Sequence, residues 1–140
     1  METANKTILK VEITIHAPIE KVWDRWISPD HIMRWNNASD DWHTPYAEND
    51  LRVGGKFVSR MAAKDGSSSF DFNGIYSEVK LHELISYTIE GGRTVEVHFS
   101  DKDGSITVIE NFEAENINSN ELQVAGWQAI LNNFKKYVEG

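Results

Sequence analysis

The densest group of chemically capable side chains in this sequence is Asp40-Asp41-Trp42-His43. Two carboxylates and an imidazole this close together are suitable ligands for a divalent metal ion, and they can equally act as an acid and a base. Aspartates in a polar loop more often cap helices or face water. We therefore predict no metal site here, and no bound cofactor elsewhere in the chain.

Glu110 is the second candidate, because it follows Ile106 and Val108 in the same row of alternating residues. A strand with that alternation would turn the carboxyl of Glu110 toward an apolar interior. Buried there without a partner, the carboxyl would have its pKa raised and could act as a general acid. An edge position, or an ion pair with Arg60 or Arg93, is the alternative.

The standard catalytic motifs do not occur: there is no G-x-S-x-G, no H-E-x-x-H, no P-loop and no G-x-G-x-x-G. Asp101-Lys-Asp-Gly104 begins like a calcium loop, but the twelfth position of that loop would be Phe112 in place of Glu. We predict a hairpin turn there. The chain has no cysteine, which excludes disulfides, thiol catalysis and cysteine-based metal sites.

Aromatic side chains are a stronger signal than any polar motif, because they are more numerous than a core of this size requires. Packing explains each of them singly, but as a set they suit a cavity for a flat or greasy molecule with a few polar atoms at its mouth. The set is Trp35, Trp42, Phe57, Phe70, Phe72, Tyr76, Tyr87 and Trp127.

The first third of the chain predicts one strand and two short helices. Leu9 to Ile15 alternate apolar and polar residues, which indicates a half-buried strand. Pro18 suits the first turn of a helix that ends at Ser28-Pro29-Asp30, and a second short helix follows from Asp30 to Trp35. The polar stretch from Asn36 to Pro45 is predicted to be a loop.

From Tyr46 onward the pattern predicts five or six further strands joined by short turns. Lys64 to Ser69 forms a hairpin loop with Asp-Gly at its tip, and Asp101 to Gly104 forms another. Gly74 is predicted to mark a bulge or sharp bend. Successive strands with short turns indicate an antiparallel, curved sheet.

The end of the chain predicts a long helix. One apolar stripe repeats at steps of three and four residues and consists of Val124, Trp127, Leu131, Phe134 and Val138. Gly126 lies in this helix, where it leaves room for close packing or for a ligand. The predicted fold is therefore α+β, a curved antiparallel sheet wrapped around a long C-terminal helix, with two short helices after the first strand.

Length and charge limit the classes of function. A chain of 140 residues is most simply one domain, residues 1–140. The net charge of −8 and the scattered basic residues argue against binding to nucleic acids or to an anionic membrane surface. No apolar run approaches a membrane span, and the N-terminus lacks a signal region, so we expect a cytoplasmic protein.

Four segments together resemble a known family. They are Ala17-Pro18-Ile-Glu-Lys-Val22-Trp23, Trp35, Asp50-Leu-Arg-Val-Gly54-Gly55-Lys-Phe57 and Gly126-Trp127-Gln-Ala-Ile-Leu131. Their order and spacing are similar to the Hsp90-ATPase-activator-homologue domain of the START-like, Bet v 1-like helix-grip superfamily. The resemblance runs from about Thr7 to Glu139.

This resemblance implies several functions. Members of the superfamily bind lipids, hormones and polyketides in a cavity, and some are cyclases or dehydratases. The eponymous co-chaperone stimulates the Hsp90 ATPase and normally carries an additional N-terminal domain. Because no such segment precedes the domain here, we expect at most a weak chaperone interaction.

We therefore expect a protein that binds a small apolar, aromatic or lipid-like molecule in a cavity of at least ~300 Å³ between the sheet and the C-terminal helix. The alternatives are a cyclase- or dehydratase-type enzyme acting in the same cavity, and an Hsp90-interacting protein. No catalytic residue is assigned. The predicted ligand-binding residues are Met33, Trp35, Trp42, His43, Phe57, Met61, Phe70, Phe72, Tyr76, Tyr87, Glu110 and Trp127.

Overall fold

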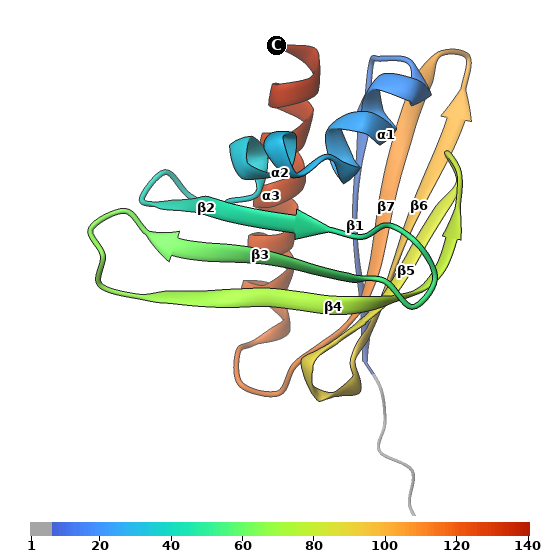
Figure 1. The fold of residues 1–140 in the computed structure, drawn as a ribbon. Helices are drawn as coiled ribbons and strands as arrows, with labels where there is room; N and C mark the ends of the chain where they lie inside the picture. Colours follow the sequence, from blue (N-terminus) through green and yellow to red (C-terminus); the bar gives the residue numbers. More distant parts are fainter. Residues whose placement is uncertain (1–6) are drawn as a thin grey trace, which may run out of the picture.

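Seven strands form one antiparallel sheet in the order β1-β7-β6-β5-β4-β3-β2, in a computed structural model that describes residues 7–140. In Figure 1 the sheet curls so that β2, β3 and β4 cross in front of the long helix α3, while β1 and β7 run along it. The elements in chain order are β1 (Ile8–Ile15), α1 (Ile19–Ile27), α2 (Pro29–Trp35), β2 (Trp42–Asn49), β3 (Lys56–Ala63), β4 (Ser69–Lys80), β5 (Leu84–Ile89), the short 3-10 helix η1 (Glu90–Gly92), β6 (Thr94–Lys102), β7 (Ser105–Glu113) and α3 (Asn120–Glu139). The α+β helix-grip fold predicted from the sequence is confirmed.

The inward face of the sheet carries the apolar rows that the alternation predicts. Val97 on β6 pairs with Glu110 on β7, and Glu110 pairs in turn with Val11 on β1. Asp103 and Gly104 both have positive φ angles between β6 and β7, as a tight two-residue hairpin turn requires. The segment is thus a turn, as predicted, and this hairpin fixes the register that sends Glu110 inward.

α3 packs its apolar stripe onto the sheet and also covers one sheet edge. Ser119 caps the helix by accepting a hydrogen bond from the backbone N–H of Leu122 at 3.1 Å. On the side facing β1, Gln128 donates to the carbonyl of Glu12 at 3.1 Å. Since β1 is an edge strand, this contact occupies a backbone group that would otherwise be free to pair with another chain.

The two short helices close the end of the sheet at which α3 finishes (Figure 1). Trp35 donates its indole N–H to the carbonyl of Arg25 at 2.9 Å, which ties α2 to α1. The rings of Trp26 and Trp35 lie 4.9 and 4.7 Å from that of Phe134, centroid to centroid. These contacts fill this end of the molecule with aromatic side chains. None of the helices in residues 7–140 is long and apolar enough to cross a membrane.

The predicted loop from Asn36 to Pro45 ends early, because β2 already begins at Trp42. Pro45 is tolerated there because β2 is an edge strand, and because the register with β3 shifts between His43 and Tyr46.

Gly74 does not mark a bulge. Its pairing with Phe57 and with Ile89 is regular, and the irregularity on β4 lies between Tyr76 and Glu78. A side chain on Gly74 would place its Cβ 2.8 Å from a ring carbon of Phe57. Glycine is present at this position because the Phe57 ring passes directly over the backbone.

Candidate functional site

A pocket of about 270 Å³ lies between the first half of α3 and the inward faces of β3, β4 and β7. Half of its ten lining residues are apolar or aromatic, and the other half are polar or charged. The lining residues are Asn36, Met61, Phe70, Phe72, Arg93, Glu110, Glu115, Gln123, Trp127 and Ile130. We call this hollow the Glu110 pocket. Its volume is slightly below the ~300 Å³ expected from the sequence.

Glu110 is the most unusual side chain in the pocket. It is only 5% exposed, and its carboxyl makes no hydrogen bond or ion pair with any residue from 7 to 140. Burial raises the pKa of Glu110 from 4.5 to about 8, because the charged form is poorly solvated in the interior. At neutral pH the group is therefore mostly a neutral carboxylic acid that faces the hollow.

Neither arginine considered as a partner for Glu110 forms an ion pair with it. The Nε of Arg60 lies 3.0 Å from Asp71 Oδ1, and the side chain of Arg60 is half exposed. Arg93 does line the pocket, but its Nη1 donates to the backbone carbonyl of Glu113 at 3.3 Å. The carboxyl thus stays without the cation that would lower its pKa.

Flat aromatic surfaces form two of the walls. The indole of Trp127 lies parallel to the ring of Phe112, and on another side it meets the ring of Phe72 edge-on at 6.2 Å. Phe70 and Met61 are paired across β4 and β3 and continue this apolar surface. A ring-shaped molecule would find faces and edges to pack against here.

Gln123 also lines the pocket, and it was not among the residues predicted from the sequence. Its Oε1 accepts from the backbone N–H of Glu115 at 2.9 Å, and its Nε2 donates to the carbonyl of Asn118 at 3.0 Å. Gln123 is buried at the start of α3 and anchors the loop that precedes the helix. A signal was present in the sequence, because Gln123 lies four residues before Trp127 and so on the same face of α3.

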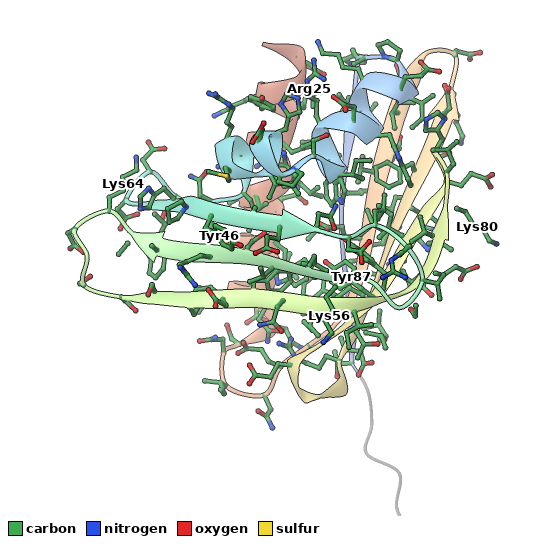
Figure 2. All side chains as sticks on the ribbon, in the orientation of Figure 1. Arg25, Tyr46, Lys56, Lys64, Lys80 and Tyr87 are labelled. Carbon is green, nitrogen blue, oxygen red and sulfur yellow. The ribbon has the colours of Figure 1, made fainter. Side chains whose placement is uncertain are left out.

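A second, smaller hollow of about 80 Å³ gathers most of the remaining predicted aromatics. Trp35, Phe57, Tyr76 and Tyr87 line it, and Phe72 lines both hollows. Figure 2 shows Tyr87 behind β3 and β4, on the enclosed side of the sheet. The predicted aromatics are thus divided between two adjacent spaces instead of surrounding a single one.

Tyr87 and Tyr76 differ in how their hydroxyls are satisfied. The Tyr76 hydroxyl donates to Asn49 Oδ1, and Asn49 in turn donates to the carbonyl of Ile27 at 2.7 Å. The Tyr87 hydroxyl has no hydrogen-bond partner among the described residues. The pKa of Tyr87 is raised, chiefly by burial and then by the charge of Glu110. The Tyr87 hydroxyl and the Glu110 carboxyl are therefore close enough to interact electrostatically.

Three predicted ligand-binding residues line neither hollow. Met33 is 38% exposed, because the positions of α2 that face inward are Ile32 and Trp35. His43 is exposed on the edge strand β2, while Trp42 packs against Phe70 with ring centroids 6.0 Å apart. Within the described part of the chain, no three His, Asp or Glu side chains are grouped to hold a metal ion.

The fold and the sequence match known proteins along almost the whole chain. The family model described as Activator of Hsp90 ATPase homolog 1-like protein matches residues 16–139. The solution structure of an AHSA1-like protein from Aeromonas hydrophila is 47% identical with a TM-score of 0.86, covering 94% of this chain and 92% of that one.

Other solved structures extend this likeness. A protein from Cytophaga hutchinsonii is 53% identical with a TM-score of 0.81, covering 93% of this chain and 90% of that one. A protein from Nitrosomonas europaea shares the fold at 16% identity and a TM-score of 0.80, with 94% of each chain covered. No curated protein matches the chain.

Proposed function

The chain belongs to the Activator of Hsp90 ATPase homolog 1-like family, and on that premise we propose that it binds a small, mainly apolar molecule in the Glu110 pocket. Ligand pockets are typically concave and apolar, with a few polar groups that orient the ligand. The Glu110 pocket joins an apolar and aromatic surface of five residues to five polar or charged residues that could orient a ligand. Its volume of about 270 Å³ suits a compact molecule, smaller than the ligands that fill pockets of roughly 300–1,000 Å³.

The unpartnered carboxyl of Glu110 is the observation that carries this proposal. Ile106 and Val108 precede it in the same inward row and are fully buried, so an apolar residue at position 110 would fit the pattern. The carboxyl oxygens of Glu110 remain accessible from the hollow, because Ser86 Oγ is the one fully enclosed side-chain oxygen without a partner among residues 7–140. A polar atom of a bound ligand would supply the missing partner.

Binding of tetralin, a bicyclic hydrocarbon, tests the proposal. We expect tetralin to shift the NMR resonances of ¹⁵N-labelled protein, with the largest changes at the indole N–H of Trp127 and at the amides of Phe72 and Glu110. Ile130→Trp enlarges a side chain of the lining and should weaken binding at least tenfold.

Ile75→Trp is the matched control, since Ile75 lies on β4 and is 48% exposed. It should leave tetralin binding unchanged. Two results would contradict binding in this pocket: no shift of the NMR resonances at saturating tetralin, or an unchanged dissociation constant in Ile130→Trp.

General-acid catalysis of the cyclase or dehydratase type is a second candidate function, and the raised pKa of Glu110 favours it. A carboxyl that keeps its proton at neutral pH can donate that proton to a hydroxyl group that leaves as water, and the carboxylate so formed can take the proton from the neighbouring carbon as the double bond forms. The test is mass spectrometry of molecules that co-purify with the protein. Under this candidate, wild type converts such a molecule to a product lighter by one water, and Glu110→Gln binds it unchanged.

A further inference from the structure

We propose that the molecule bound in the Glu110 pocket is uncharged and places a carbonyl oxygen against Glu110, which donates its carboxylic O–H to that oxygen. This inference rests on the proposed function and adds the chemical class of the ligand. It concerns the single buried carboxyl in the lining for which the described residues supply no partner.

The charged groups around the pocket leave no net charge for a ligand to neutralise. Arg93 is directed to the carbonyl of Glu113, and the carboxylate of Glu115 accepts hydrogen bonds from the backbone and side-chain nitrogens of Asn118 at 2.8 and 2.7 Å. With one positive and one negative group in the lining and a neutral Glu110, the pocket favours an uncharged ligand.

The faces opposite Glu110 add no further charge. α3 contributes Gln123, Trp127 and Ile130 to the lining, and the amide of Gln123 is already engaged with the loop before α3. β3 and β4 contribute Met61, Phe70 and Phe72. β5 contributes Tyr87 to the adjacent hollow, where its raised pKa keeps the phenol neutral.

The protonation state decides whether the carboxyl of Glu110 can donate a hydrogen bond to the ligand or only accept one. An ammonium group would require the ionised form, whereas a carbonyl oxygen requires the protonated form. Burial raises the pKa of Glu110 to about 8, and no neighbouring cation opposes this. At pH 7 the protonated form is the major one, so a hydrogen-bond acceptor is the matching group.

Three ligands of nearly the same shape test the inference: 1-tetralone, tetralin and 1-aminotetralin. Dissociation constants are measured by NMR at pH 6 and pH 9.5. At pH 6 we expect wild type to bind 1-tetralone about tenfold more tightly than tetralin, which is the effect of one hydrogen bond. At pH 9.5, where Glu110 is ionised, this preference should disappear.

Two variants separate the proton from the side-chain shape. Glu110→Gln keeps an N–H donor that does not titrate, so it should prefer 1-tetralone at both pH values. Glu110→Leu has no hydrogen-bond donor, so it should show no preference for 1-tetralone at either pH value. The dispersion of the NMR resonances shows whether each variant is folded. The pH series on wild type tests the inference even if a variant does not fold.

The outcomes distinguish this inference from the proposed function. If none of the three molecules binds to wild type, the proposed function fails. If tetralin binds as well as 1-tetralone at pH 6, or 1-aminotetralin binds better than both, the pocket binds small molecules but the carbonyl inference is wrong. A preference that persists in Glu110→Leu would also overturn it.

Discussion

Trp127 on α3 and Phe112 on β7 stack face to face, with ring centroids 4.0 Å apart and ring planes within 5° of parallel. One face of the indole is thereby occupied by the sheet, while another part of the ring borders the Glu110 pocket. Phe112 lies two residues beyond Glu110 on the same side of the strand. The stack therefore fixes how closely α3 approaches the sheet beside the pocket.

Replacing Trp127 tests how much of that ring is packed. Because one side borders the pocket, Trp127→Ala should lower the free energy of unfolding by about 2–3 kcal/mol, less than the 3–5 kcal/mol typical of a fully packed tryptophan. Trp23→Ala is the comparison, since Trp23 is 5% exposed and should show the full loss. Urea denaturation measures both, and an equal loss in the two variants would mean that Trp127 borders no hollow.

The titration of Glu110 should appear in the pH dependence of stability. Its pKa is about 8 in the folded protein against 4.5 as the ordinary value. Between these values the folded state keeps a proton that the unfolded state releases, so rising pH destabilises the fold. Below pH 4.5 both states are protonated and the effect vanishes, while above pH 8 it stays constant.

Glu110→Gln removes this titration. We expect the free energy of unfolding of Glu110→Gln, minus that of wild type, to rise between pH 4.5 and pH 8. The rise should be about 1.4 kcal/mol for each pH unit. Glu83→Gln changes the same charge at an exposed turn position and is the control. Denaturation at a series of pH values measures the two variants, and parallel curves for both would show that Glu110 is not buried as a neutral acid.

Two glycines should respond in opposite directions to an added methyl group. A Cβ on Gly126 would meet nothing within 4 Å, so Gly126→Ala should raise the free energy of unfolding by about 0.5–1 kcal/mol through its higher helix propensity. A Cβ on Gly74 would lie 2.7 Å from the carbonyl oxygen of Thr88, so Gly74→Ala should lower it by about 1–3 kcal/mol. Thermal unfolding distinguishes them, and the same sign for both would contradict this packing.

The two buried tyrosines provide another matched pair. Tyr76→Phe leaves the side-chain oxygen of Asn49 without its donor and should cost about 1–2 kcal/mol. Tyr87→Phe removes a hydroxyl with no partner among the described residues, so its effect should stay within about 0.5 kcal/mol. Chemical denaturation measures both losses. A larger loss for Tyr87→Phe would reveal a partner for its hydroxyl, such as a bound water.

The sequence predicted the strands and helices well because their periodicity is local. The row of Ile106, Val108 and Glu110 needed only the alternation of a strand to place the carboxyl inward. Helix spacing likewise placed Leu131, Phe134 and Val138 on the buried face of α3. These rows placed side chains on the inward faces, while their role in a binding site stays a prediction.

The parts of the site that depend on tertiary packing could not be predicted. Gln123 acquires its position in the pocket lining only when the loop after β7 folds back onto α3. The ring of Phe57 lines the smaller hollow and lies against the backbone of Gly74 on the neighbouring strand. Neither the backbone path of a loop nor a close contact between strands leaves a periodic trace in the sequence.

The pairing of β1 with β7 has a consequence for synthesis on the ribosome. Ile15 pairs with Ile106 and Ile8 pairs with Glu113, so the first strand to emerge finds its partner only after nearly the whole sheet has been translated. At about 5–20 residues per second, β1 waits for several seconds with its apolar row unpaired. The hairpins from β2 to β6 can form in the meantime because their pairings are local. Closure of the sheet, and with it the wall behind Glu110, is therefore expected to be a late step in folding.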